Sequence, residues 1–276
     1  FAGMFNSFGT HVTIFDQHTR LLEREDPDIA TEVVADLTDA GIEIKPETQL
    51  TQVKDNGEKV TLYYQQGDQS NTAEFDAVLV AVGRRPNVSS LGLENTDIAL
   101  TNRGAIQVDD HLRTTVQNIW ALGDVNGGPM FTYVSLDDFR IIIDQLFGKG
   151  DRSTADRMVI PTASFLNPPL ANVGLNERQA KSAGYDLQTF KLSVKAIPKA
   201  RVLEDQRGLY KVIVDQKTHL ILGATLYAAE AHEIINLIAL AMKAKLPYER
   251  LRDMIYTHPT MSEALNDLFK TPVVKS

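Results

Sequence analysis

The chain of 276 residues contains no cysteine, and this absence excludes several kinds of site. Disulfide bridges, metal sites built on thiolates and cysteine nucleophiles all need a sulfur that this chain does not supply. No apolar run approaches the roughly 20 residues that a membrane-spanning helix needs, and the first residues lack the basic stretch that opens a secretory signal. We therefore predict a soluble, cytoplasmic protein without a membrane partner or a metal site.

The chain also contains fewer basic than acidic residues. The chain has 28 lysines and arginines against 36 acidic residues, which gives a net charge of −8. Such a balance disfavours nucleic acid and anionic membranes as partners. Hydrophobic residues make up 43% of the composition, and at this length that is enough for two compact domains with cores of their own.

The first residues combine a helical pattern with a strand that ends in an acid. Apolar side chains at helical spacing predict a helix with a buried apolar face: Phe1, Met4, Phe5 and Phe8. Gly9 ends this helix, and the β-rich run 11–15 leads to Asp16. In a βαβ dinucleotide unit an acid at this point binds the adenosine ribose, although a strand that ends in aspartate is also common without a cofactor. Because the pattern starts in mid-helix, we interpret the chain as a fragment.

The following stretch predicts further α/β structure. The expected elements are a helix over 27–40 and strands over 42–44, 49–53 and 60–64. The continuous apolar run 75–82 predicts a strand that is buried on both faces of a parallel sheet. It ends at Gly83 and Arg84, and ligands in open α/β sheets bind where the strands end.

The middle of the chain offers a second strand end. Strand-like runs occupy 106–109 and 118–122, and the second leads to Gly123 and Asp124. Glycine lets the backbone approach a ligand closely, and the carboxylate can bind a polyol. A helix predicted to begin at Thr132 offers free N–H groups and partial positive charge at its N-terminus. An ordinary amphipathic core helix is the alternative.

The last third predicts an antiparallel sheet followed by a histidine–carboxylate pair. The expected elements are strands over 187–194, 209–214 and 220–227 and helices over 176–183 and 233–244. We interpret His232 and Glu233 as helix-capping residues. Further on, Pro259 keeps His258 out of a regular helix. Thr260 or Ser262 can cap the next helix, which lets Glu263 fold back on one imidazole nitrogen and leaves the other free to exchange a proton. A histidine near a helix start is also commonly structural.

Three motifs in this order resemble the flavoprotein disulfide reductases, such as glutathione reductase, dihydrolipoamide dehydrogenase and mercuric reductase: residues 81–87 (AVGRRPN), 121–125 (ALGDV) and 258–263 (HPTMSE). The resemblance covers essentially the whole chain. It implies an α/β plus α+β fold, with partial Rossmann-like NAD(P)- and FAD-domain segments before an antiparallel-sheet dimerisation domain. It also implies an NAD(P)H-binding domain over 1–104, a C-terminal piece of the FAD-binding domain over 105–152 and a dimerisation domain over 153–276.

The resemblance implies roles for the cofactor residues. Gly123 and Asp124 resemble the binding site of the FAD ribityl chain, and Thr132 resembles the first residue of the helix aimed at the flavin. Gly83 and Arg84 resemble the loop near the nicotinamide. Asp16 suits NADH better than NADPH because a 2′-phosphate would meet like charge, and His18 and Arg20 nearby can soften that preference.

The resemblance also implies a catalytic pair that acts across a homodimer. His258 resembles the acid/base that reaches the partner subunit's redox disulfide, with Glu263 orienting it. The chain would lack the first strand and glycine-rich loop of its nucleotide domain, most of the FAD domain and the CxxxxC disulfide. We therefore predict that residues 1–276 alone are inactive.

Residues 251–269 look like the bacterial reactive-chlorine-resistance branch of this family, which implies reduction of hypothiocyanous acid or a related oxidant. Activity like that of glutathione, dihydrolipoamide or mercuric reductase is an alternative. A single-cysteine NADH oxidase or CoA-disulfide reductase is a further one, although such enzymes usually lack the histidine–glutamate pair. A dimerisation module without catalysis is the alternative from another class.

Overall fold

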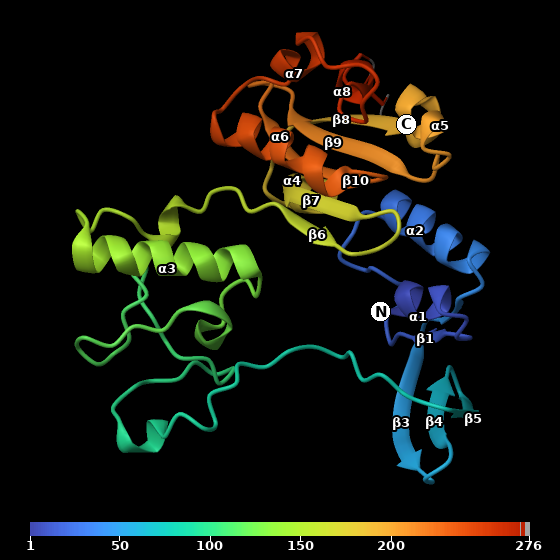
Figure 1. Ribbon diagram of the computed structural model, residues 1–276, viewed down its shortest axis with the longest axis vertical. Coiled ribbons are helices and arrows are strands. Elements are labelled where there is room, and N and C mark those ends of the chain that lie inside the picture. Colours follow the sequence, from blue (N-terminus) through green and yellow to red (C-terminus); the bar gives the residue numbers. More distant parts are fainter. Residues whose placement is uncertain (271, 274–276) are drawn as a thin grey trace. The chain divides into compact units, whose positions relative to one another are not determined.

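A computed structural model describes residues 1–270 and 272–273 (Figure 1). The chain packs into two compact units, one made of residues 1–78 with the described residues from 159 onward, the other of residues 79–158. Among the described residues, no helix combines the length and the apolar character needed to cross a membrane.

A five-stranded antiparallel sheet is the centre of the first unit. Its strand order is β6 (Thr162–Ser164), β7 (Leu170–Gly174), β10 (Ile221–Tyr227), β9 (Leu209–Asp215) and β8 (Leu187–Ser193). The hairpin between β9 and β10 turns at Asp215, whose Oδ2 accepts a hydrogen bond from Thr218 Oγ1 at 2.6 Å. The three predicted strands and their antiparallel pairing are confirmed.

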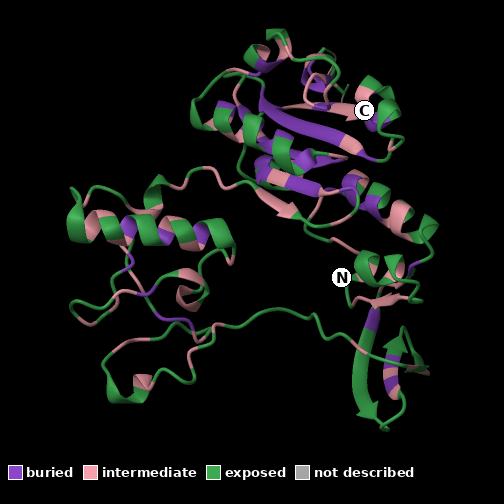
Figure 2. Cartoon of the chain, viewed as in Figure 1, coloured by how far each residue is buried: buried purple, intermediate pink, exposed green. Residues whose placement is uncertain are grey.

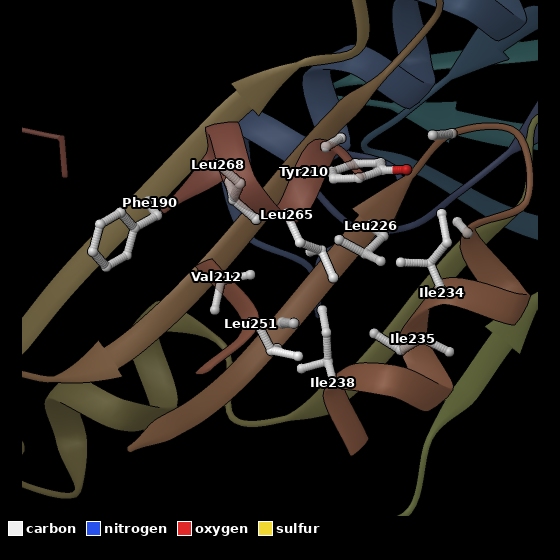
Figure 3. Packing of buried hydrophobic residues seen from close by; sticks show 14 of the residues in the cluster. Phe190, Tyr210, Val212, Leu226, Ile234, Ile235, Ile238, Leu251, Leu265 and Leu268 are labelled. Carbon is white, nitrogen blue, oxygen red and sulfur yellow. The ribbon is translucent and has the colours of Figure 1, made fainter. Parts of the chain in front are cut away.

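Helices cover both faces of this sheet. They are α4 (Glu177–Ser182), α5 (Pro198–Val202), α6 (Ala231–Lys243), α7 (Glu249–Asp253) and α8 (Ala264–Leu268). Ile235 and Ile238 of α6 and Leu265 of α8 join Val212 and Leu226 of the sheet in the main core (Figures 2 and 3). Burying one such aliphatic side chain contributes roughly 1.5–3 kcal/mol.

The opposite face of the sheet is covered by a helix from the N-terminal part of the chain. Side chains alternate between the two faces of a strand, so Leu170 and Tyr227 point away from α6. They pack against Ile29 and Val33 of α2 (Pro27–Asp39). The hydroxyl of Tyr227 also donates to Asp36 Oδ2 at 2.8 Å. Residues 26–39 are therefore fixed on the C-terminal sheet.

The N-terminal elements follow the predicted order. They are α1 (Ala2–Ser7), β1 (Thr13–Phe15), β2 (Glu43–Lys45), β3 (Thr48–Asp55), β4 (Val60–Gln66) and β5 (Gln69–Phe75). β1 and β2 pair in parallel, while β3, β4 and β5 form an antiparallel meander. The apolar side chains of α1 that we predicted to be buried are exposed, however, because the described residues pack nothing over Phe1, Met4, Phe5 or Phe8.

The predicted strand over 75–82 is wrong. β5 ends at Phe75, and the residues after it are irregular and exposed, Val82 to 89%. A strand that is apolar on both faces is stable inside a parallel sheet whose two faces are covered, and residues 76–82 pair with no strand among the described residues.

The second unit is built around one helix, α3 (Thr132–Phe147), which begins where predicted. The predicted strands over 106–109 and 118–122 are wrong. Isolated bridges are all that forms there, Leu100 with Ile106 and Arg113 with Trp120, and a single bridge is too short to make a strand. The mixed α/β fold class as a whole is confirmed.

Candidate functional site

The predicted histidine–carboxylate pair forms. His258 Nδ1 lies 2.9 Å from Glu263 Oε2. The imidazole is 73% exposed while the carboxylate is 17% exposed, so the pair presents its histidine outward from a shielded acid. When the hydrogen on Nδ1 is donated to Glu263, Nε2 carries the lone pair and can accept a proton.

The turn before α8 places this carboxylate. The backbone N–H of Glu263 donates to Thr260 Oγ1 at 3.2 Å, and the Thr260 hydroxyl donates to the carbonyl of Thr257 at 2.8 Å. Thr260 therefore closes the turn before α8, but the predicted side-chain cap on the helix itself does not form: Glu263 is at the N-cap position and no side chain makes a capping hydrogen bond there. Ser262 Oγ contacts Thr260 Oγ1 at 3.2 Å. α8 begins at Ala264, the residue after Glu263.

α8 is fixed by its packing and by one amide. Leu265, Leu268 and Met261 are buried in the main core. The Nδ2 group of Asn266 donates to the carbonyls of Arg252 at 2.6 Å and of Met254 at 3.1 Å. Glu263 is therefore attached to a rigid base, which is what the orienting partner of an acid/base needs.

Asp16 lies where the sequence predicts, at the carboxyl end of β1. Its backbone N–H donates to the carbonyl of Lys45 at 3.0 Å, and its own carbonyl accepts from Thr48 at 2.9 Å. The carboxylate is therefore presented at the edge of the parallel pair. His18 contacts it directly, Nδ1 to Oδ1 at 2.7 Å, whereas the Arg20 guanidinium donates to backbone carbonyls instead, that of Glu25 at 2.7 Å.

The second unit brings together two predicted cofactor residues. Arg84 Nη1 lies 3.8 Å from Asp124 Oδ2, and Arg84 Nη2 donates to the carbonyl of Met130 at 2.8 Å. Gly123 adopts a φ of 74°, a left-handed conformation that favours glycine. A side chain there would also crowd Ser135 Oγ at 3.1 Å. Gly83 also has a positive φ, 136°, and stands in open space. Thr132 is the first residue of α3.

Asp138 is a residue of this region that sequence reasoning missed. It is 1% exposed, on α3, and its Oδ2 accepts from the backbone N–H of Gly123 at 2.7 Å and from Asn126 Nδ2 at 3.0 Å. The Arg157 guanidinium pairs with its other oxygen. Asp138 therefore holds the turn that presents Asp124. Its signal was an acid inside the apolar stripe of Val134 and Ile141.

A buried lysine was missed as well. Lys211 of β9 is 3% exposed, and its ammonium lies 2.8 Å from Asp26 Oδ2, 2.8 Å from Glu177 Oε2 and 3.1 Å from Asp28 Oδ1. Burial alone would lower the pKa of Lys211, but its hydrogen bonds to Asp26 and Glu177 outweigh burial and the pKa is raised. The lysine thus stays charged between the start of α2 and the start of α4.

His232 and Glu233 do not cap a helix, which corrects that prediction. They lie within the first turn of α6, where no side chain makes a capping hydrogen bond. Their side chains are 4.0 Å apart and exposed.

The family model for pyridine nucleotide-disulphide oxidoreductases matches residues 1–138, half of the chain, and the model for the dimerisation domain of the same family matches residues 160–269. The chain belongs to the pyridine nucleotide-disulphide oxidoreductase family. The predicted family is confirmed.

Individual members of the family are similar over almost the whole chain. The probable pyridine nucleotide-disulfide oxidoreductase RclA of Escherichia coli K12 is 48% identical over 269 residues, 98% of this chain and 60% of RclA. Dihydrolipoyl dehydrogenase of Corynebacterium glutamicum is 34% identical over 97% of this chain and 58% of its own length. A solved structure, the HOCl-induced flavoprotein disulfide reductase RclA from E. coli, matches with a TM-score of 0.91 and 47% identity over 97% of this chain and 61% of that one. The predicted likeness to the reactive-chlorine-resistance branch is confirmed, and the chain spans about 60% of the length of these relatives.

Proposed function

We propose that the full-length protein is an FAD-dependent, NAD(P)H-driven oxidoreductase that reduces a disulfide or a related oxidant. The observation that carries the proposal is the 2.9 Å contact between His258 Nδ1 and Glu263 Oε2. It supplies an oriented, exposed imidazole in a chain that belongs to the pyridine nucleotide-disulphide oxidoreductases.

The residues of the second unit fit FAD. The half-exposed carboxylate of Asp124 is suited to the hydroxyls of the ribityl chain, and Gly123 permits the left-handed turn that precedes it. The N-terminus of α3 at Thr132 would offer backbone N–H groups to electron-rich atoms of the flavin ring. The flavin supplies two-electron redox chemistry when it is bound.

The first unit fits a nicotinamide nucleotide. Asp16 keeps one carboxylate oxygen free of described hydrogen bonds, and such an oxygen can accept from an adenosine ribose hydroxyl. A 2′-phosphate would meet like charge here, so we propose NADH as the favoured cofactor over NADPH.

The histidine–carboxylate pair transfers protons to and from the reacting sulfur. His258 takes a proton at Nε2 and gives it to the departing thiolate, while Glu263 stabilises the imidazolium that forms in between. Because the chain contains no cysteine, the histidine serves a sulfur that other residues provide. We propose that this sulfur lies in the partner subunit of a homodimer built on the dimerisation domain, in a part of the full-length protein outside residues 1–276, and that the protein acts in the cytoplasm.

The proposed substrate is hypothiocyanous acid or a related oxidant. The relative whose structure matches with a TM-score of 0.91 is described as HOCl-induced, and this supports an oxidant over a metabolic disulfide. Dihydrolipoyl dehydrogenase and mercuric reductase of Staphylococcus aureus are each 34% identical, so lipoamide, glutathione disulfide and Hg(II) are the competing substrates.

Steady-state kinetics of the full-length, flavin-loaded protein test the proposal. We expect NADH-dependent turnover, with the highest kcat/KM for hypothiocyanous acid among these four acceptors. Residues 1–276 alone are expected to give none. Full-length protein that dimerises in light scattering, yet shows no flavin absorbance and no turnover with any acceptor, would instead support a dimerisation module.

A further inference from the structure

His258 lies on a segment that connects two short helices. Both helices are fixed in the main core, α7 by Leu251 and α8 by Leu265 (Figure 3). Residues 254–260, which follow α7, are irregular. Residues 255–260 make no backbone–backbone hydrogen bond with any residue that the structure describes. The position of His258 therefore depends on contacts of side chains.

The half-buried amide of Asn266 holds the start of this segment. Its Nδ2 group donates to the carbonyls of Arg252 at 2.6 Å and Met254 at 3.1 Å, and reaches that of Leu251 at 3.5 Å. Carbonyls only accept hydrogen bonds, so the NH₂ side of the amide must face them. The last carbonyls of a helix have no partner within it, and Asn266 supplies that partner to α7.

Tyr256 attaches the middle of the segment to the same helix. Its hydroxyl donates to the Leu251 carbonyl at 2.8 Å, and its ring packs against the main core. Burial raises the pKa of Tyr256 to about 12, so the hydroxyl keeps its proton at neutral pH and remains a donor. The segment is thus held at Met254 and at Tyr256 before it reaches His258.

The helix that holds the start of the segment also holds its end. Glu263, at the N-cap of α8, contacts the His258 imidazole at 2.9 Å. Asn266 lies three residues later, and its backbone N–H donates to the Glu263 carbonyl at 3.0 Å. One turn of α8 therefore carries both the amide that fixes Met254 and the carboxylate that orients the ring. A shift of Met254 away from Asn266 would move or turn the imidazole relative to Glu263.

We propose that Asn266 is a positioning residue for proton transfer: its amide fixes the start of the segment that leads to His258, and so sets where the imidazole is presented to the reacting sulfur. This inference rests on the proposed function, because it assumes that His258 exchanges the proton. It assigns Asn266 to the reduction of the oxidant and gives it no part in the oxidation of NADH.

The Asn266→Asp variant of the full-length, flavin-loaded protein tests the inference. It keeps the size of the side chain but turns acceptors toward the carbonyls of Arg252 and Met254. We expect kcat with the oxidant to fall about tenfold to hundredfold, the cost of a misplaced catalytic group. The rate at which NADH bleaches the flavin absorbance in stopped flow should stay within about twofold of the wild type.

Two further variants keep this test decisive. Asn266→Ala removes the donor without adding charge, should lower kcat by about threefold to tenfold, and takes the place of Asn266→Asp if that variant is purified without flavin. Asn236→Asp is the matched control, because Asn236 is an exposed asparagine of α6 whose Nδ2 donates to one carbonyl, that of His232 at 3.0 Å. It should keep the wild-type kcat.

A double variant shows whether Asn266 acts through His258. In the His258→Asn background, Asn266→Asp should lower kcat by less than about a further threefold, because the group that it positions is already absent. An equal loss in both backgrounds, an equal slowing of flavin bleaching and turnover, or wild-type kcat in the flavin-loaded Asn266 variants would each overturn the role of Asn266. Wild-type turnover of His258→Asn itself would instead overturn the catalytic pair on which the proposed function rests.

Discussion

Lys211 and Asp26 form a buried ion pair, 2.8 Å from Nζ to Oδ2, that connects the central sheet to the start of α2. The pair lies on the face of β9 opposite the main core, because Val212 and Val214 point the other way. Asp28 and Glu177 complete the surroundings of the same ammonium. The segment that follows Asp16 is thus fixed to the dimerisation sheet by charge as well as by the packing of Ile29 and Val33.

Removing the buried ammonium should destabilise the first unit strongly. Lys211→Met leaves Asp26 and its neighbours without their shared cation, and breaking a buried pair costs roughly 3–5 kcal/mol. Lys181→Met is the matched control, since Lys181 contacts the same Glu177 at 2.6 Å but is 63% exposed, and exposed pairs contribute about 0–1 kcal/mol. Urea unfolding followed by circular dichroism measures both. Equal losses in the two variants would show that Lys211 does not act as a buried cation.

The same cluster predicts how stability depends on pH. Burial alone would raise the pKa of Asp28, but its hydrogen bonds with Lys191 and Lys211 outweigh burial, and the pKa is lowered. Hydrogen bonds with Lys181 and Lys211 lower the pKa of Glu177 in the same way. A carboxyl whose pKa is lower in the folded than in the unfolded state stabilises the fold at pH values above its unfolded-state pKa of about 4. This stabilisation is lost as the pH falls through the folded-state pKa. The raised pKa of Lys211 acts the other way, and its contribution is lost above about pH 10.4.

We therefore expect the contribution of this cluster to the free energy of unfolding to be constant between about pH 5 and 10. Below about pH 5 this contribution should decrease. Urea midpoints at a series of pH values, for the wild type and Lys211→Met, isolate the cluster by difference. The difference between the two proteins should shrink as the pH drops below about 4. A difference that stays constant down to pH 2.5 would rule out this assignment.

Asp138→Ala should release flavin from the full-length protein. It removes the acceptor of the Gly123 N–H and of Asn126 and the partner of Arg157, and an unpaired buried group costs about 1–3 kcal/mol. We expect the ratio of flavin to protein absorbance to fall after purification and to recover in part with added FAD. Asp97→Ala, at an exposed acid of the same unit, should keep its flavin. Full flavin content in Asp138→Ala would refute the role of Asp138 in shaping the site.

The parts of the fold that were predicted correctly rest on local patterns. The two β-rich runs 209–214 and 220–227, joined by a short turn that begins at Asp215, identify the β9–β10 hairpin directly. The His258–Glu263 contact was predictable for the same reason, since both residues lie in one short turn. Runs such as 75–82 and 118–122 are different, because an apolar run becomes a strand only where distant residues supply a neighbour.

Lys211 and Asp138 could not be predicted as buried site residues, for a different physical reason. Lys211 shares a strand face with Leu209 and Ile213, and a lysine at such a position is normally taken as solvent-exposed. Its burial depends on acids that lie 34 residues or more away in the sequence, Glu177 being the nearest along the chain. Asp138 likewise gains its partner, Gly123, only once α3 packs on the turn. A charged residue inside an apolar stripe was the available signal in both cases.

The catalytic pair is the central claim, and turnover of the His258→Asn variant tests it most directly. In full-length, flavin-loaded protein of matched flavin content, we predict that kcat with NADH and the oxidant substrate falls by about 10²- to 10⁴-fold, the usual contribution of a general acid/base. Glu263→Gln should fall less, by roughly tenfold to hundredfold, since it removes one charge-assisted hydrogen bond. A His258→Asn enzyme that turns over within about threefold of the wild type would contradict the account, because proton transfer would then not depend on this imidazole.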